Sequence, residues 1–367
     1  MKRVIMIAVA LVVFIGSSAQ AQLDEVRFMN RTTNKEDSIK GTIDQESPAG
    51  IRIKQRAMGT DIPAADILLV IYHLAGITVL DFRAPFGKEI RGLTPGASEK
   101  LRKDLLAEAL KGFEELLPKV SVHPRAKRYI QFKIATVKAA QAETEVFKRA
   151  GAIAALQAFK IDHPDSWQIV AALKILAKLL EDQGDVQEAR KTYEELGKVA
   201  GIPAETKLES DVLVAKLLMR GSKYADAEAK LKSLSTTLPN DDPQKPSLLI
   251  LLAQAQIEQN NLGGVEPLLR SALASTTTDP TIRAHAHNTL GDYFQKKSQL
   301  DDAFWEYLKV DVLYNQDREQ QAKALYFLSK LFDKVKNDPI RARECKERLA
   351  DKVFAGLDYA KRSADEK

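Results

Sequence analysis

The chain has 367 residues, of which 45% are hydrophobic and 29% are charged, so it can bury a sizeable core and is too long for one small compact domain. The formal net charge is +5, which becomes +3 once the two charges of Lys2 and Arg3 are subtracted. Such a weak positive excess argues against a nucleic-acid partner and requires no anionic membrane. The single cysteine, Cys345, excludes an intramolecular disulfide.

Residues 1–21 have the pattern of a secretory signal peptide. Lys2 and Arg3 precede an apolar run over residues 4–16, and residues 19–21 form a small-x-small exit, which predicts cleavage after Ala21. The apolar run is too short to span a hydrocarbon core of about 30 Å comfortably, and no later segment is long enough. We therefore expect a protein exported to the periplasm, the bacterial cell envelope or the exterior. An uncleaved anchor is the alternative.

Residues 22–75 alternate between apolar and polar side chains in short runs, as in strands. Pro48-Ala49-Gly50 predicts a hairpin turn, and the polar stretch over residues 58–61 predicts another turn. Several short strands in so little chain indicate a small β-barrel. The segments GTIDQESPAGIRIK and DIPAADILLVIY resemble SH3-like or Sm-like modules that precede repeat domains in exported bacterial proteins. This resemblance implies a peptide-binding or docking module, and a capping or dimerising module without a ligand is the alternative.

Residues 76–96 contain Pro85-Phe86-Gly87, Gly92 and Pro95-Gly96, which predict an extended or turn-like linker and a domain boundary. After it, residues 98–117 carry apolar side chains at helical spacing, which predicts one leading amphipathic helix.

A period of 38 residues dominates the remainder of the chain. Similar small and aromatic positions recur in units that begin at Val170, Leu208, Pro246, Ala284 and Ala322. Two helices of about 14 to 16 residues and two short turns use up about 38 residues, so the period predicts stacked helical hairpins. Gly291 in the first helix of its unit and Ala303 in the second are expected where the two helices approach most closely, because a larger side chain there would force the pair apart.

One unit makes the pattern specific: Leu290, Gly291 and Phe294 are followed by Ala303 and Tyr307. This arrangement resembles the tetratricopeptide repeat. The resemblance implies a mainly α fold, a right-handed α-solenoid over residues 97–355 with the leading helix and about six hairpins. A weaker unit covers residues 140–164, the last unit slips by one residue to Ala342, and residues 356–367 are expected to form a frayed polar tail.

Catalytic and metal-binding patterns are missing from the sequence. His285 and His287 are two residues apart on a helix, so they point to different faces and are expected to be solvated or to line the groove. Cys345 is expected to be a small core residue, with a reactive thiol as the alternative. We expect no metal, no cofactor and no catalytic residue.

In the tetratricopeptide family the first helices of the hairpins line a concave groove, and the resemblance carries this groove to matching positions of the chain. The predicted partner-binding residues are Lys174, Lys178, Lys216, His285, Asn288, Tyr326 and Lys330. Their mixed polarity predicts an extended peptide or protein partner with some acidic character.

The sequence thus favours a non-enzymatic interaction scaffold of the cell envelope. A structural protein that self-assembles through the β-module or the solenoid ends is the alternative. An enzyme would need a site at the junction of the β-module and the solenoid, which the sequence does not reveal.

Overall fold

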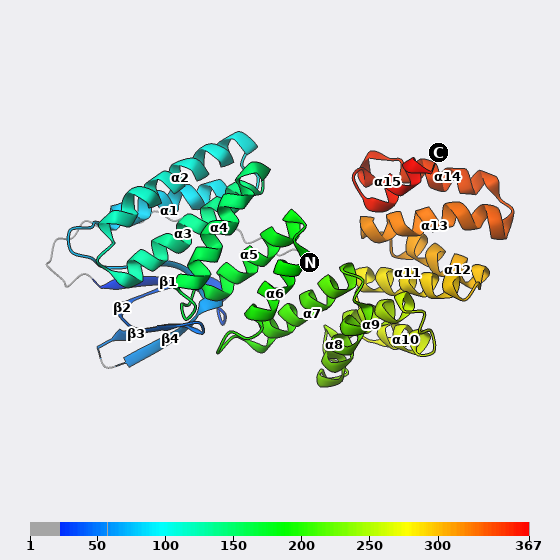
Figure 1. Ribbon diagram of the computed structural model, residues 1–367, viewed down its shortest axis with the longest axis horizontal. Helices are drawn as coiled ribbons and strands as arrows, with labels where there is room; N and C mark the ends of the chain where they lie inside the picture. Colours follow the sequence, from blue (N-terminus) through cyan, green and yellow to red (C-terminus); the bar gives the residue numbers. More distant parts are fainter. Residues whose placement is uncertain (1–22, 57, 367) are drawn as a thin grey trace. The chain divides into compact units, whose positions relative to one another are not determined.

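The computed structural model describes residues 23–56 and 58–366, and the signal segment predicted over residues 1–21 lies outside them. The chain divides into two compact units between Ala172 and Leu173, inside helix α5. Both units are mainly helical, and the first also contains a small sheet (Figure 1). The division falls well after the linker at residues 76–96 where the sequence placed the domain boundary.

The first unit begins with an open antiparallel sheet. Its strands are β1 (Asp24–Asn30), β2 (Lys35–Ser47), β3 (Gly50–Gln55), β4 (Met58–Pro63) and β5 (Ile67–Ile71). Their order is β4-β3-β2-β1-β5, so β4 and β5 form the edges and do not pair with each other. The predicted closure into a barrel is therefore wrong. One buried face, with Val26, Ile43 and Ile53 almost fully covered, is enough for an antiparallel sheet, and the other face can meet water.

Two turns of this sheet test the sequence analysis. The hairpin at Pro48-Ala49-Gly50 is confirmed, because Ser47 and Gly50 close the register between β2 and β3. A Cβ on Gly50 would lie 2.0 Å from the carbonyl oxygen of Ile62, so only glycine fits there. The second predicted turn, residues 58–61, is instead part of β4, which pairs with β3 in continuous register.

The predicted linker is largely a helix, α1 (Val79–Leu93). Thr78 and Asp81 form a capping box at its start, and Phe82 and Phe86 are buried on one face. Pro85 lies inside the helix, where proline usually interrupts the backbone hydrogen bonds. The capping residues and the buried aromatic pair outweigh that cost, which reading Pro85-Phe86-Gly87 as a turn overlooked.

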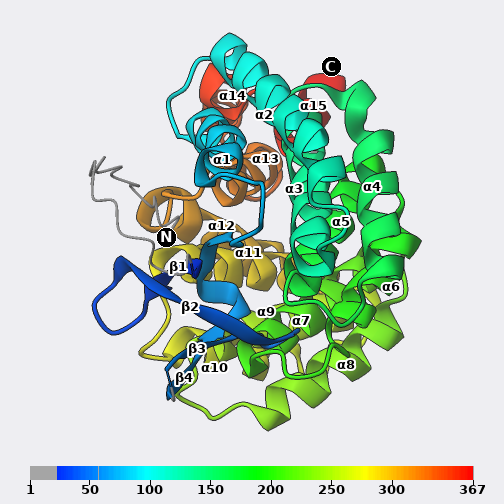
Figure 2. The same cartoon turned by 90° about the vertical axis from the view of Figure 1, so that its left-hand side faces the viewer.

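Three longer helices complete the first unit: α2 (Glu99–Lys119), α3 (Pro124–Ala142) and α4 (Arg149–Asp162). Helix α2 confirms the leading helix, and Ser98 caps its start. Helices α3 and α4 pack together as the weak hairpin predicted over residues 140–164, although α3 begins well before that range. Both views of the molecule show α1, α2 and α3 on one side of the strands (Figures 1 and 2).

Polar side chains of α3 join the helices to the sheet. The hydroxyl of Tyr129 accepts a hydrogen bond from the backbone N–H of Val70 at 3.1 Å. Arg125 donates to the carbonyl oxygen of Ile43 at 2.5 Å, and Arg128 forms an ion pair with the buried carboxylate of Glu46. Sheet and helices therefore share one core rather than forming separate domains.

The second unit continues α5 and adds further helices. They are α5 (Ile169–Gln183), α6 (Val186–Leu196), α7 (Ala204–Arg220), α8 (Tyr224–Thr237), α9 (Lys245–Glu258), α10 (Val265–Ala274), α11 (Pro280–Lys296), α12 (Leu300–Leu313), α13 (Arg318–Lys336), α14 (Pro339–Leu349) and α15 (Asp358–Asp365). From α6 to α14 every helix packs against the next, and α7, α9, α11 and α13 also pack in series. This arrangement confirms the predicted stack of helical hairpins.

The turn inside each hairpin explains both the period and its one irregularity. A left-handed residue with φ between 51° and 91° follows each first helix at Gly184, Ser222, Asn260, Ser298 and Asn337. In the first four turns the next N–H bonds to the carbonyl five residues back, as Gln299 does to Phe294 at 2.9 Å. In the last turn Asp338 bonds to Phe332, six residues back. One extra residue in this turn accounts for the predicted slip to Ala342, which is buried.

The small residues lie at the tightest helix contacts. A Cβ on Gly291 would be 2.5 Å from Cζ of Tyr307, so glycine is required there. The neighbour that imposes this requirement is Tyr307 and not Ala303, although Ala303 is fully buried. Cys345 is also buried, which confirms its core role, and burial raises the pKa of its thiol to about 11.

The predicted frayed tail is wrong for most of its length. Residues 358–365 form α15, whose packing on α13 places Leu357, Tyr359 and Ala360 against the core cluster. Among residues 23–56 and 58–366, no helix combines the length and the apolar character that crossing a membrane demands.

Candidate functional site

A groove of about 620 Å³ lies on the second unit, at the C-terminal ends of the first helices of successive hairpins. Its lining residues are Met219, Arg220, Tyr224, Gln254, Ile257, Glu258, Asp292, Gln295, Lys296, Lys323, Phe327 and Tyr359. They come from α7, α8, α9, α11, α13 and α15 (Figure 1). The groove is therefore built by the repeat itself, and α15 supplies one wall.

The repeat places equivalent side chains side by side in this groove. Helix α9 contributes Gln254, Ile257 and Glu258, and 38 residues later α11 contributes Asp292, Gln295 and Lys296. Because three- and four-residue spacings keep side chains on one helix face, both triplets point the same way from adjacent helices.

Asp292 holds the centre of the groove together. Its carboxylate accepts a hydrogen bond from the hydroxyl of Tyr307 at 2.8 Å and forms an ion pair with Lys323. Burial alone would lower the pKa of Lys323, but the attraction of Asp292 outweighs burial and the pKa is raised. Lys323 thus stays charged and bonded within the protein. Arg220, at the other end, pairs with Glu181 at 2.6 Å.

Two charged groups of the groove have no such partner. Lys296 and Glu258 are both exposed, and neither forms a hydrogen bond or ion pair with the described residues. Lys216 is exposed one helical turn before Arg220, on the same face of α7, and is equally without a bonded partner in the described part of the chain. These three groups are available to a partner molecule.

Aromatic side chains form the apolar part of the groove. Phe327 stacks on Tyr307 with ring centroids 4.8 Å apart and an angle of 15° between the planes. Tyr359 of α15 lies 5.9 Å from Phe327, and Tyr224 lines the groove from the start of α8. Aromatic rings beside uncommitted charges are typical of surfaces that bind peptides.

The two predicted groove lysines on α5 bind neighbouring carboxylates instead. Lys174 bonds to Glu209 at 2.5 Å, and Lys178 bonds to Asp182 at 2.7 Å. Neither lines the groove, whereas Lys216 alone of the predicted cations stays exposed without a bonded partner in the part that the structure describes.

His285 and Asn288 are committed to the packing between repeats. Gln254 lies 2.8 Å from Nε2 of His285, and burial lowers the pKa of His285 to about 4, so the neutral ring accepts this hydrogen bond. Asn288 is fully buried and donates to the side-chain oxygen of Gln320 at 2.8 Å. Each side chain joins two adjacent first helices.

Tyr326 and Lys330 are covered by the end of the chain. Glu366 accepts hydrogen bonds from the hydroxyl of Tyr326 at 2.5 Å and from Lys330 at 2.9 Å. Tyr326 is 7% exposed, and the ring of Tyr359 lies 5.4 Å from it. Both predicted residues therefore face a protein segment, but that segment belongs to the same chain.

Sequence reasoning missed Tyr224, Phe327 and Tyr359 as groove residues. Lys296 and Glu258 follow positions that the repeat frame already assigned to the groove, and extending that frame by one residue would have found them. Tyr359 had no such signal, because it lies beyond the last repeat.

Histidine chemistry does not create a site here. His287 packs on the ring of Tyr314, and its Nδ1 lies 2.6 Å from Glu306. Burial alone would raise the pKa of Glu306, but hydrogen bonds from His287 and Lys309 lower it. Within the described ranges no three histidine, cysteine or acidic side chains gather as metal ligands would.

Solved structures with a similar fold exist, whereas no family model and no curated protein matches the chain. A tetratricopeptide repeat protein from Parabacteroides merdae ATCC 43184 has 13% identity and a TM-score of 0.53, over 77% of this chain and 98% of that chain. The fold is a tetratricopeptide-like helical repeat. PilF of Pseudomonas aeruginosa has 16% identity and a TM-score of 0.42, over 65% of this chain and 97% of that chain. PilW, a type IV pilus biogenesis factor, has 16% identity and a TM-score of 0.45, over 65% and 98%. At these identities the similarity concerns the fold alone.

Proposed function

We propose that the chain is a non-enzymatic interaction scaffold, which holds a peptide or protein segment in the groove of its second unit. The observation that carries this proposal is the combination, in one groove of about 620 Å³, of an aromatic wall with exposed charges that lack a bonded partner among the described residues. Other charged groups of the groove, such as Lys323 and Arg220, are already neutralised by carboxylates of the protein.

The arrangement indicates how a partner binds. Apolar side chains of the partner seat against Met219, Ile257 and Phe327, and a carboxylate meets Lys296 or Lys216. A charge-assisted hydrogen bond of this kind contributes about 1.5 to 3 kcal/mol. The proposed partner therefore carries at least one carboxylate beside an apolar side chain. The acidic character predicted from the sequence remains, now assigned to Lys216 and Lys296.

Selection from a random heptapeptide library displayed on phage, against the full chain, tests the proposal. We expect the selected peptides to be enriched in acidic residues next to aromatic or aliphatic ones. Each selected peptide is then measured by fluorescence polarisation on the Lys216→Glu/Lys296→Glu double variant, where the affinity should fall at least tenfold.

A matched control is provided by Lys198→Glu/Lys232→Glu, which makes the same change of charge at exposed positions outside the groove. Equal losses in both variants, or unchanged affinity in the groove variant, would show that the peptides bind elsewhere.

We also propose an envelope location, on the strength of the pattern in residues 1–21. The test is cell fractionation followed by N-terminal sequencing of the mature protein. A mature chain that begins at Gln22 supports export and cleavage, whereas an intact Met1 in the cytosolic fraction contradicts both.

One observation favours the second candidate function, self-assembly. Strand β4 pairs only with β3, so its other edge is free of any strand in the part of the chain that the structure describes. Exposed edges are templates for pairing with another chain. Light scattering at several protein concentrations decides the matter: a constant monomer mass rules out assembly through this edge.

A further inference from the structure

Helix α15 fixes two contacts on α13, the last first helix of the stack. The ring of Tyr359 lies 5.4 Å from Tyr326 and 5.9 Å from Phe327, measured between ring centroids. Seven residues later, Glu366 accepts hydrogen bonds from Tyr326 and Lys330. Seven residues are almost two helical turns, so both contacts lie on one face of the segment.

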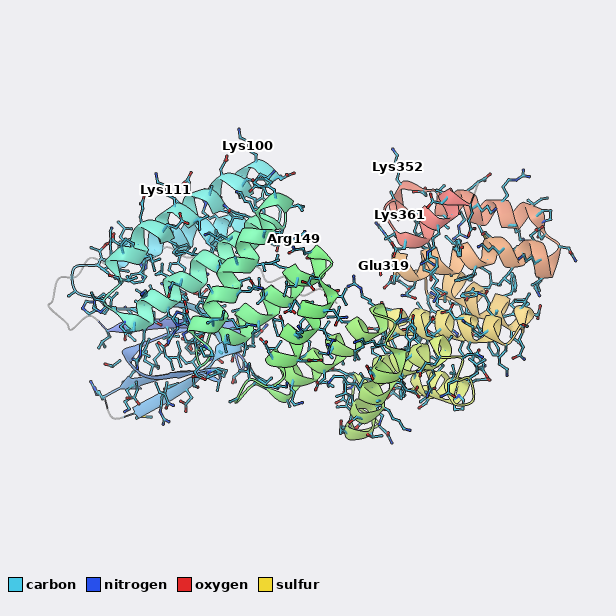
Figure 3. All side chains as sticks on the ribbon, in the orientation of Figure 1. Lys100, Lys111, Arg149, Glu319, Lys352 and Lys361 are labelled. Atoms are coloured by element: carbon cyan, nitrogen blue, oxygen red, sulfur yellow. The ribbon has the colours of Figure 1, made fainter. Side chains whose placement is uncertain are left out.

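The rest of α15 is loosely held. No residue of the helix is buried, and a hollow of about 410 Å³ lies between it and α14. Its outward residues are charged: Lys361 is exposed, as is Lys352 on the short helix before it, and Figure 3 labels both. Gly356, with φ of 87° and nothing within 4 Å of a Cβ added there, provides a flexible joint just before the helix.

The α13 surface beneath α15, in contrast, is firmly built. Phe327 is stacked on Tyr307, and the ammonium of Lys330 lies 4.1 Å from the ring centroid of Tyr326. Departure of α15 would expose two aromatic rings and free the charge of Lys330 from Glu366. An exposed aromatic surface beside an unpaired cation favours binding of a helix that carries an aromatic side chain and a carboxylate.

We propose that this surface of α13, formed by Tyr326, Phe327 and Lys330, is a docking site for an amphipathic helix, and that α15 is its intramolecular occupant. The partner helix carries an aromatic residue and, seven residues later, a carboxylate, which is the chemistry that Tyr359 and Glu366 display. It binds by displacing α15.

This inference extends the proposed function, because Tyr359 also forms a wall of the groove. Displacement of α15 removes that wall and opens the groove at its α13 end. A partner that supplies both a helix for α13 and an extended segment for the groove would therefore bind the two surfaces together.

The test uses the full chain and a defined probe, a fluorescein-labelled synthetic peptide of residues 352–367. We expect the wild-type chain to bind it weakly, because α15 already occupies the site. The Tyr359→Ala/Glu366→Ala double variant weakens the internal occupant, so it should bind the probe at least tenfold more tightly. A probe that carries the same two substitutions should bind neither protein. Equal binding of the unmodified probe to both chains, or none to the variant, overturns the proposal.

Hydrogen exchange of the wild-type chain gives a second readout that needs no substitution. Amides of α15 should exchange through local opening at least a hundredfold faster than those of α13. Equal protection of the two helices would show that α15 is a fixed cap and would overturn the proposal.

Charge variants separate this inference from the proposed function. Lys330→Gln in the opened double variant should weaken binding of the 352–367 probe and leave the selected heptapeptides unaffected. Lys216→Glu/Lys296→Glu should do the reverse. Loss of heptapeptide binding alone would reject the groove and keep the helix site, and the opposite result would reject the helix site alone.

Discussion

The two units of the protein are held together by different kinds of contact. In the first, polar side chains join sheet to helix: Arg128 pairs with Glu46, and Lys133 pairs with the buried Glu89 at 2.6 Å. In the second, small and aromatic side chains recur at one spacing, as Gly291 and Tyr307 illustrate. The repeated apolar packing leaves a period in the sequence, whereas each polar joint is unique and leaves none.

The largest effect is expected at the buried ion pair of the first unit. Glu46→Ala leaves the guanidinium of Arg128, whose side chain is 19% exposed, without its carboxylate. Removing one partner of a buried pair costs about 3 to 5 kcal/mol. Urea denaturation followed by Trp167 fluorescence in a Trp305→Phe background reports on this unit, because Trp167 lies 5.6 Å from Tyr129.

The matching change in the second unit is Glu209→Ala, which breaks the exposed pair with Lys174. Exposed pairs contribute no more than about 1 kcal/mol, so the denaturation midpoint should hardly move. Similar losses at Glu46 and Glu209 would contradict the contrast between the two units.

Overpacking should do to the second unit what loss of a charge does to the first. Ala303 is fully buried between helices, so Ala303→Leu should lower the free energy of unfolding by about 1 to 3 kcal/mol. The control is Ala225→Leu, at an exposed position in the first turn of α8, where a change within about 0.5 kcal/mol is expected. Thermal unfolding followed by circular dichroism compares them. Equal shifts in Tm would show that the repeat register is wrong.

These differences mark what the sequence predicts. The hairpins, the close approach at Gly291, the burial of Cys345 and the slip at Ala342 follow from spacing, because a repeat supplies several copies of the same environment. Helix α1 was hidden by Pro85, and α15 has no repeat partner to reveal it. The groove was predicted on the correct helices but mostly at residues that pair within the chain, since a cross-repeat bond such as Gln254 to His285 depends on two units at once.

His285 introduces a buried polar group into the repeat packing, and pH reveals its effect. Burial lowers its pKa in the folded chain to about 4, against about 6.5 when unfolded. Between these values the unfolded chain binds a proton that the folded chain does not, so stability is complete above pH 6.5 and declines as the pH falls towards 4. Because the ring is partly exposed, we expect a loss of about 1 to 2 kcal/mol between pH 7 and pH 5. Urea midpoints at both values check this.

His285→Gln is the matched variant, because its amide can still bond to Gln254 but does not titrate. The loss between pH 7 and pH 5 should be smaller in this variant by the contribution of His285. An identical pH dependence in wild type and variant would place the titrating group elsewhere.

The smallest effect concerns the turns that set the period. Ser298 adopts φ of 59°, a left-handed conformation that costs a residue with a Cβ about 1 to 2 kcal/mol, whereas glycine adopts it freely. Glycine also gains about 0.5 to 1 kcal/mol of conformational entropy in the unfolded chain, so Ser298→Gly should stabilise the protein by about 0.5 to 1 kcal/mol. Asn260, 38 residues earlier, has φ of 58°, but asparagine tolerates this conformation better than serine. Asn260→Gly should therefore stabilise the protein less than Ser298→Gly in the same urea titration. The reverse order would mean that the two turns, although equivalent in the repeat, are strained by different neighbours.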